Sequence, residues 1–201
     1  TPLTVILSSA QLLEQSAAPE QAPYVDNIQA EGRRMKALVE DMLTLFRAQK
    51  SAGTPPDTAA DLSETAVTEA LRFEPVAFEA GHLLDYDIAP SLPVRGDGAR
   101  LGQALAVLLD NAVKYAAPGT AIHLDAVRQG GRAVVAVANE GPDIPPDKLS
   151  HIFDRFYRAD DARTDGSSFG LGLPIARAIV DAHRGTLLCT SSGGITTFSI
   201  S

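Results

Sequence analysis

The chain has 201 residues, 45% of them hydrophobic, and a formal net charge of −8 from 25 acidic and 17 basic residues. A chain of this length and composition can bury a substantial core in one or two domains. Because nucleic acids bind net-basic proteins or strongly basic stripes, the acidic balance excludes a nucleic-acid-binding surface. The sequence has no apolar run of about 18 residues and no signal peptide, so we expect membrane attachment only through segments outside this chain. The single cysteine, Cys189, fits a reducing compartment and a cytoplasmic location.

Residues 1–50 show hydrophobic residues at helical spacing in two blocks, which are separated by QSAAPEQAP. The second block carries two heptad rows: Ile28, Met35 and Met42, with Leu38 and Leu45 as the companion row. This pattern is typical of a helical-bundle seam. We therefore expect a helical hairpin that pairs with a second copy into a dimeric four-helix bundle. The alternative is a hairpin that packs against the C-terminal region of its own chain.

Residues 51–60, SAGTPPDTAA, are small, polar and contain prolines, which is typical of a linker. They separate a domain of residues 1–50 from one of residues 61–201. Hydrophobic periodicity and capping residues predict these elements of the second domain: a helix from about Leu62 that is interrupted near Pro75, strands 83–88 and 93–95, a helix capped by Asp97 that ends at Tyr115, a hairpin of strands 122–127 and 133–138, a helix 173–182, and closing strands 186–190 and 196–200. Helices and strands mix without strict alternation, so we expect an α+β fold with helices on one face of a sheet.

A glycine-rich loop, GSSFGLGLP, runs directly into the helix predicted for residues 173–182. Gly170 and Gly172 flank Leu171, and Leu173 follows. Exposed N–H groups and the positive end of a helix attract anions, so this segment is a candidate phosphate site. The alternative is an ordinary turn.

The segment LLDNAVKY places Asn111 among apolar residues of a long helix. Asparagine is a poor helix former and a buried amide needs partners, so it either bonds protein groups or faces a ligand. Its oxygen would suit Mg²⁺, and Lys114 on nearly the same face would add positive charge toward a polyphosphate.

Two further segments combine turns with polar or aromatic residues. In VANEGPDIPPDKL, Asn139 ends a strand before a turn at Gly141, and it either pairs with the edge of a nucleobase or is a turn asparagine. In IFDRFYRADDARTDGSSFG, aromatic residues such as Phe153 alternate with arginines before a small, polar stretch. This segment is typical of a hinge followed by a mobile lid, or of a charged surface helix followed by a loop.

The order and separation of these four segments resemble the ATP-binding domain of sensor histidine kinases. LLDNAVKY resembles its N box, NEGPDIP its first G box, IFDRFYR its F box and GLGLPIARAIV its second G box, while TPLTVILSSAQLL resembles the helix after the phosphoacceptor histidine. The resemblance covers practically the whole chain. It implies an α/β sandwich of the type shared with gyrase and heat-shock-protein ATPases, which binds ATP and Mg²⁺ beneath a flexible lid.

The resemblance also implies roles for individual residues. Asn111 would ligate Mg²⁺ and act in catalysis together with Lys114 and Arg158. The nucleotide would contact Asn111, Lys114, Tyr115, Asn139, Gly141, Asp143, Ile144, Phe153, Gly170, Leu171, Gly172 and Leu173. The family motif His-Glu-x-x-Thr-Pro-Leu aligns with Thr1-Pro2-Leu3, so the phosphoacceptor histidine is expected four positions before Thr1. Thr1 matches a position that helps to orient water for dephosphorylation of the response regulator.

The function that this resemblance implies is autophosphorylation of the histidine by ATP, followed by phosphotransfer to an aspartate of a response regulator receiver domain. The protein would be a homodimer and the cytoplasmic part of a membrane-bound sensor. The histidines of the chain itself, His82, His123, His151 and His183, are expected to be structural, with His183 near a helix C-terminus that favours positive charge.

Three departures from the family pattern leave an alternative open. Asn139 stands where relatives usually have aspartate, Asp143 replaces a glycine, and Val107 occupies a position that is commonly polar. A degenerate kinase that docks a response regulator and favours its dephosphorylation would fit these changes. A stand-alone ATPase of the gyrase type is disfavoured by the helical hairpin.

Overall fold

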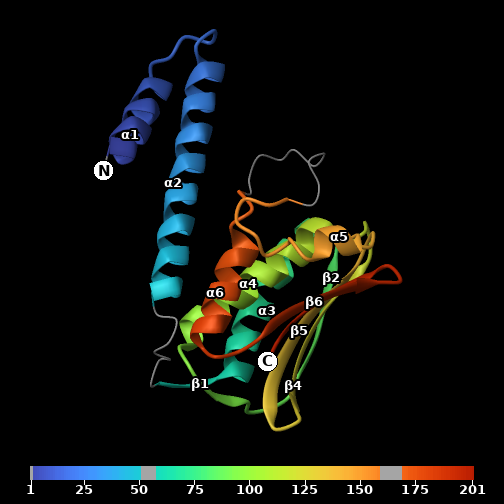
Figure 1. The fold of residues 1–201 in the computed structure, drawn as a ribbon. Coiled ribbons are helices and arrows are strands. Elements are labelled where there is room, and N and C mark those ends of the chain that lie inside the picture. Colours follow the sequence, from blue (N-terminus) through green and yellow to red (C-terminus); the bar gives the residue numbers. More distant parts are fainter. Residues whose placement is uncertain (1, 51–57, 159–168) are drawn as a thin grey trace.

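The computed structural model describes residues 2–50, 58–158 and 169–201. A pair of antiparallel helices stands beside an α/β domain, and the second helix leans on one side of that domain (Figure 1). Within the described residues, no helix combines the length and the apolar character that crossing a membrane requires.

The helix pair consists of α1 (Pro2–Glu14) and α2 (Ala22–Lys50). The two helices approach closely at Gly32, where a Cβ atom would lie 2.7 Å from Cδ2 of Leu7. A buried amide completes the contact, because Nε2 of Gln29 donates a hydrogen bond to Glu14 at 2.8 Å. Glycine thus permits the close helix packing that the apolar stripe of α1 requires.

One stripe of α2 faces the α/β domain and corrects our expectation for the companion row. Leu45 is buried and Leu38 packs against the core of that domain, so neither belongs to the seam of Met35 and Met42. The seam residues Met35 and Met42 are 56% and 50% exposed. At 100° per residue, the three-residue offset places the two rows roughly a sixth of a turn apart, so one helix presents both.

The α/β domain contains a five-stranded sheet of order β2-β4-β5-β7-β6. Its strands are β2 (Leu83–Ile88), β4 (Ala121–Gln129), β5 (Arg132–Glu140), β6 (Leu187–Ser192) and β7 (Ile195–Ile200). β2 runs parallel to β4, and all other neighbours are antiparallel. The predicted hairpin between β4 and β5 is confirmed, with Gly130 and Gly131 at positive φ in the turn.

Three helices cover one face of this sheet, as predicted (Figure 1). They are α3 (Leu62–Glu79), α4 (Gly98–Tyr115) and α6 (Gly172–Ala182), while the short α5 (Pro146–Leu149) lies by the loop after β5. The core between helices and sheet contains fully buried Leu105, Leu108 and Ile179 against Ile122 and Leu124. Asp97 caps α4 as expected, because its carboxylate accepts hydrogen bonds from the amides of the first turn.

The predicted interruption near Pro75 is wrong, because α3 continues through it. Pro75 lies on the solvent side, where water can bond the carbonyl of Leu71, which the proline leaves without an N–H donor. Buried Phe73 and Ala77 on either side keep the helix against the core.

A short strand that the sequence did not suggest begins the domain. β1 (Ala59–Asp61) pairs antiparallel with β3 (Pro93–Arg95) and starts inside the expected linker. Asp61 then caps α3, and its carboxylate also accepts a hydrogen bond of 2.9 Å from the amide of Leu92. The carboxylate therefore ties the start of the domain to the segment before β3.

Candidate functional site

A cavity of about 530 Å³ opens between α4, α6 and the loop that follows β5. Its size falls within the range of small-molecule sites. It is lined by Asp41, Gln103, Val107, Asp110, Asn111, Lys114, Tyr115, Asn139, Pro142, Asp143, Ile144, Pro145, Lys148, Ile152, Tyr157, Arg158, Phe169, Gly170, Gly172, Leu173, Pro174, Ile175, Thr196 and Phe198. The cavity is thus lined by residues from all four sequence segments described above. The segment IFDRFYRADDARTDGSSFG contributes residues from its beginning and its end.

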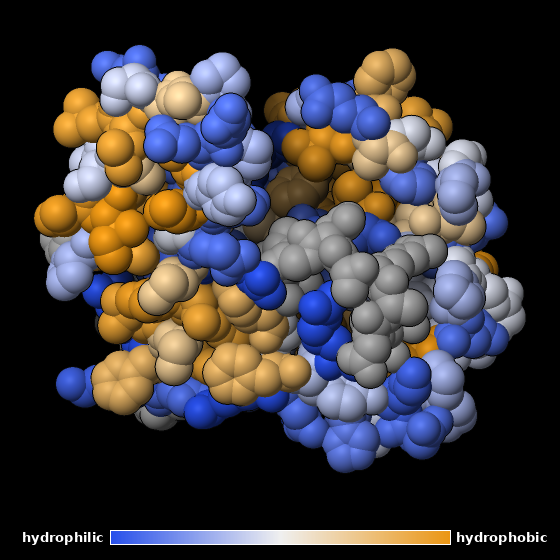
Figure 2. Space-filling view, turned by 90° about the horizontal axis from the view of Figure 1, so that it is seen from above, coloured by the Kyte–Doolittle hydropathy of each residue, from blue (hydrophilic) through white to orange (hydrophobic). Residues whose placement is uncertain are grey.

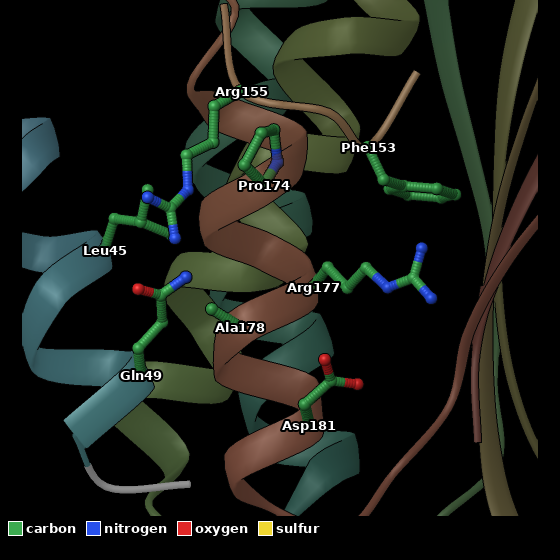
Figure 3. Close-up of a pocket in the computed structure, with 8 residues that line it drawn as sticks. All are labelled: Leu45, Gln49, Phe153, Arg155, Pro174, Arg177, Ala178 and Asp181. Carbon is green, nitrogen blue, oxygen red and sulfur yellow. The ribbon is translucent and has the colours of Figure 1, made fainter. Parts of the chain in front are cut away.

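A second cavity, of about 200 Å³, lies where α2 meets α6. Its lining residues lie on different sides of α6, because Arg155 reaches toward Leu45 of α2 whereas Phe153 and Arg177 point toward the sheet (Figure 3). The polar groups do not converge on one point, so the larger cavity is the candidate site.

The wall formed by α4 carries Asn111 and Lys114, one helical turn apart. The side chain of Asn111 is half-buried and forms no hydrogen bond with any other residue in the described part of the chain. Its amide is therefore available to a ligand. Nζ of Lys114 lies beside the carboxylate of Asp110, which orients the ammonium group along the same wall.

The floor of the cavity carries two buried polar side chains, Asn139 at 4% and Thr196 at 6% exposure. They are direct partners in the ladder between β5 and β7. The amide nitrogen of Asn139 donates to the carbonyl of Glu140 at 3.2 Å, so its oxygen remains an acceptor toward the cavity. The hydroxyl groups of Thr196 and Ser191 lie 2.8 Å apart, and Ser191 accepts a hydrogen bond from the amide of Ile144. The adjacent loop is thus tied to the floor.

The loop after β5 accommodates Asp143 without left-handed backbone, as the sequence required of a residue other than glycine there. The carboxylate of Asp143 accepts hydrogen bonds from the amides of Gly193 and Gly194 at 3.1 and 2.8 Å. It braces the hairpin between β6 and β7 while the residue lines the cavity. Gly141 is required for close approach, since a Cβ atom there would lie 2.8 Å from the carbonyl oxygen of Tyr115.

The wall formed by the glycine-rich loop depends on Gly170 and Gly172. Gly170 has a φ of +66°, and a Cβ atom on it would lie 2.6 Å from the carbonyl oxygen of Tyr157. Its own carbonyl accepts a hydrogen bond of 3.0 Å from Phe156, which itself has a φ of 63°. Two left-handed residues therefore hold these two chain segments side by side.

The N-terminus of α6 opens into the cavity at Gly172 and Leu173. In the described part of the chain no side chain caps this end, and the first amides of a helix lack partners within it. Pro174 contributes no N–H, so the two preceding amides are those available to an anion. A Cβ atom on Gly172 would lie 3.2 Å from Cγ1 of Val107, which packs α4 against α6 here.

The structure does not bring every predicted residue to the cavity. Leu171 is buried beneath the loop, and Phe153 lines the smaller cavity while its ring packs edge-on against Phe198 of the larger one. Gly141 lies in the turn next to the cavity but does not line it. Thr1 and residues 159–168, which make up most of the expected lid, lie outside the described residues. Thr196 is a lining residue that we missed, and only the strand register that pairs it with Asn139 reveals it.

None of the four histidines lines the cavity. Nδ1 of His183 donates to the carbonyl of Ile179 and its Nε2 accepts from the amide of Asp97, at 2.7 and 3.0 Å. His183 is the C-cap residue of α6, so its expected place at a helix C-terminus is confirmed, and both ring nitrogens are hydrogen-bonded. His82 is buried, and His123 and His151 lie beside aspartates on the surface.

The donor groups at the cavity fit a cation that keeps part of its own hydration. Among the described residues there is no group of three or more histidine, cysteine or acidic side chains that could hold a metal. The amide oxygen of Asn111 on the wall has no hydrogen-bond partner among the described residues, and it is the kind of single protein ligand that Mg²⁺ accepts beside phosphate oxygens and water.

Comparison with known proteins associates both parts of the chain with described families. Residues 96–201 match the family described as histidine kinase-, DNA gyrase B-, and HSP90-like ATPase. Residues 1–51 match the His Kinase A (phospho-acceptor) domain.

Curated relatives and solved structures agree with these matches. The sensor histidine kinase TrcS of Mycobacterium tuberculosis is 36% identical over 210 residues, which cover all of this chain and 40% of TrcS. The sensor protein DltS of Streptococcus agalactiae is 31% identical over 187 residues, 93% of this chain and 47% of that protein. The chain thus spans less than half the length of these relatives. Full-length ShkA, solved in complex with AMPPNP, superposes with a TM-score of 0.81 at 28% identity and covers 99% of this chain and 42% of ShkA.

Proposed function

Because the chain belongs to the histidine kinase-, DNA gyrase B- and HSP90-like ATPase family, we propose that it is the catalytic core of a sensor histidine kinase. The proposed reaction transfers the γ-phosphoryl group of ATP to a histidine, from which it passes to an aspartate of a response regulator. Residues 1–50 would serve dimerisation and phosphotransfer, and residues 61–201 would bind ATP. Residues 51–60 would link these two domains. Because β1 begins at Ala59, the ATP-binding part would start two residues earlier than the composition suggests.

The observation that carries this proposal is the convergence of Asn111, Asn139 and Gly172 on one cavity. The floor and the helix N-terminus offer different chemistry to a ligand in the same cavity. Asn139 and Thr196 present a hydrogen-bond acceptor and hydroxyl groups to a base, whereas the amides of Gly172 and Leu173 suit phosphate oxygens. An adenine nucleotide would lie with its base on the floor and its phosphates against α6.

The remaining site residues would position and neutralise the triphosphate. Mg²⁺, when bound, would offset phosphate charge and fix the leaving diphosphate, which is what phosphoryl transfer generally requires. Asn111 would hold that ion through its amide oxygen, and Lys114, Tyr115 and Arg158, which also line the cavity, would lie near the phosphates or the ribose. Arg158 and Lys114 would contribute positive charge toward the transferred group.

The proposed partners are a second copy of the chain and a response regulator receiver domain. Hydrophobic side chains gather over the helix pair when the molecule is viewed from above (Figure 2). On α2 this face contains Ile28, Met35, Val39, Met42 and Phe46, all between 47% and 65% exposed. A four-helix bundle with a second copy would cover it. We further propose a cytoplasmic location for this part of the protein, in line with the sensor proteins it resembles.

The degenerate alternative draws support from Val107, which packs a methyl group against Gly172 at a position that is commonly polar in the family pattern. Thr1, which would orient water in dephosphorylation, lies outside the described residues. The Asn111 amide and the start of α6, neither of which has a side-chain partner in the described ranges, favour the kinase.

The test is formation of phosphohistidine. Because the matched relatives are more than twice as long, the assay uses the chain together with its natural neighbouring sequence. Incubation with ATP labelled in the γ-phosphate should give protein-bound phosphate that is stable to base and labile to acid, and that is absent in Asn111→Ala. Saturable ATP binding without any phosphohistidine would favour the degenerate alternative.

A further inference from the structure

The nucleotide cavity is not built by the α/β domain alone, because Asp41 of α2 also lines it. A stripe of α2 docks on that domain through Leu38, Leu45 and Ala48, of which Ala48 is 2% exposed. Asp41 occupies the middle of this stripe, with steps of three and four residues to Leu38 and Leu45. Helical geometry therefore directs its side chain toward the domain, where Asp41 is half-buried.

A second contact joins α2 to the glycine-rich loop. The guanidinium of Arg34, one turn before Leu38, lies 5.2 Å from the ring centroid of Phe169. Phe169 lines the cavity and directly precedes Gly170. A cation above an aromatic ring is attracted to its face, so this contact orients the start of the loop. The docked position of α2 therefore affects two walls of the nucleotide site.

Among the described residues, the carboxylate of Asp41 has no compensating partner. In the part of the chain that the structure describes, it forms neither a hydrogen bond nor an ion pair. Partial burial, with a smaller contribution from neighbouring Glu40, raises its pKa above the ordinary aspartate value. The docked arrangement already disfavours the charge on Asp41, and a second anion in the same cavity adds to that cost.

We propose that Asp41 makes nucleotide binding and docking of α2 oppose each other, so that a triphosphate in the cavity weakens the contact between the helix pair and the α/β domain. The inference rests on the proposed nucleotide site. Lys114 and Arg158 also line the cavity, but Lys114 is already beside Asp110. By linkage, the factor by which docking of α2 lowers the affinity for the nucleotide equals the factor by which the bound nucleotide lowers the docking equilibrium of α2.

The first experiment measures the affinity of ATP, ADP and adenosine for the wild type and for Asp41→Asn, by isothermal titration calorimetry. The variant should bind ATP about three- to tenfold more tightly, with a smaller gain for ADP and none for adenosine, because only the charged part of the ligand meets Asp41. The gain should shrink at high salt. Glu40→Gln is the matched control: it removes the same charge one residue away, where Glu40 is exposed and pairs with Lys36 at 3.9 Å.

The second experiment measures docking itself. Spin labels at Lys36 and Gln129 in a Cys189→Ser background report the distance between α2 and the tip of the hairpin between β4 and β5. Addition of ATP should broaden and lengthen the distance distribution in the wild type, and less so in Asp41→Asn. Adenosine should leave it unchanged in both.

Three results would overturn this inference: equal effects of Asp41→Asn and Glu40→Gln, weaker ATP binding by Asp41→Asn, or a label distance that ATP leaves unchanged. If the wild type bound no nucleotide at all, this result would contradict the proposed function itself. If the wild type and Asp41→Asn bound ATP with the same affinity, this result would refute only the proposed role of Asp41.

Discussion

Thr196 lies directly opposite Asn139 in the ladder between β5 and β7, and both side chains are buried at the floor of the cavity. The amide nitrogen of Asn139 is bonded to Glu140, which leaves the oxygen to accept from a base. A neutral acceptor makes a weaker hydrogen bond than a carboxylate, by about 1 kcal/mol. Asn139→Asp should therefore tighten ATP binding about fivefold, as measured by calorimetry.

The same substitution should lower the stability of the nucleotide-free protein, because an uncompensated carboxylate would be buried there. Chemical denaturation with and without ATP separates the two effects. Thr196→Val, which removes the hydroxyl and keeps the shape, is the companion variant and should weaken ATP binding. Unchanged ATP affinity in both variants would show that Asn139 and Thr196 do not form part of the nucleotide site.

The glycine-rich loop predicts different responses at its two glycines. Gly170→Ala introduces a Cβ atom 2.6 Å from a backbone oxygen at a residue with positive φ, so it should reduce nucleotide affinity more than tenfold. Gly172→Ala meets only a side chain, Cγ1 of Val107, at 3.2 Å. Val107→Ala should therefore rescue Gly172→Ala and fail to rescue Gly170→Ala. Equal rescue of both would show that the close contact with Val107 is not what requires glycine at 172.

The cap of α3 predicts a dependence of stability on acid. Hydrogen bonds from the backbone of Leu92 and Ser63 lower the pKa of Asp61 below its ordinary value. A lowered folded pKa means that the stability from this carboxylate is present above the unfolded pKa of about 3.9 and is lost as pH falls through the folded value. Urea denaturation of Asp61→Asn should therefore show a deficit at neutral pH that narrows in acid. Asp125→Asn, at an exposed strand position, should show neither effect.

Cys189 should be a slow nucleophile. Burial raises the pKa of its thiol to about 12, so almost no thiolate exists at neutral pH. Alkylation by iodoacetamide, followed by mass spectrometry, should be at least tenfold slower in the folded protein than in urea. Because the folded pKa is raised, stability is complete below the unfolded pKa of about 8.5 and falls as pH rises toward 12. Cys189→Ser should flatten that alkaline loss, and rapid alkylation of the folded protein would contradict the burial of the thiol.

Most of the fold could be predicted, because local signals and packing agree. Asp97 caps the start of α4 with its carboxylate, and Gly130 and Gly131 form the turn between β4 and β5. Pro75 does not break α3, because it lies on the solvent side, where water can bond the carbonyl that the proline leaves without a donor. The rows of α2 could not be assigned from spacing alone. Heptad periodicity places Leu38 and Met35 on adjacent faces, but only the fold shows which face meets the α/β domain.

The site was predictable where a residue type is unusual for its element, as for Asn111 in a helix and for the double glycine before α6. Thr196 and Asp41 could not be found in this way. A threonine is ordinary in a strand, and an aspartate is ordinary on a helix. Their place at the cavity comes from the register of β7 against β5 and from the docking of α2.

In the proposed function, one cavity holds a magnesium-bound nucleotide between Asn111 and the start of α6. The most direct measurement is calorimetric titration with ATP, with and without Mg²⁺, of the wild type, Asn111→Ala and the exposed-surface control Asn27→Ala. We predict saturable binding that Mg²⁺ strengthens in the wild type and in the control, and loss of that strengthening in Asn111→Ala. Binding by Asn111→Ala that responds to Mg²⁺ as the wild type does would contradict the assignment of this cavity.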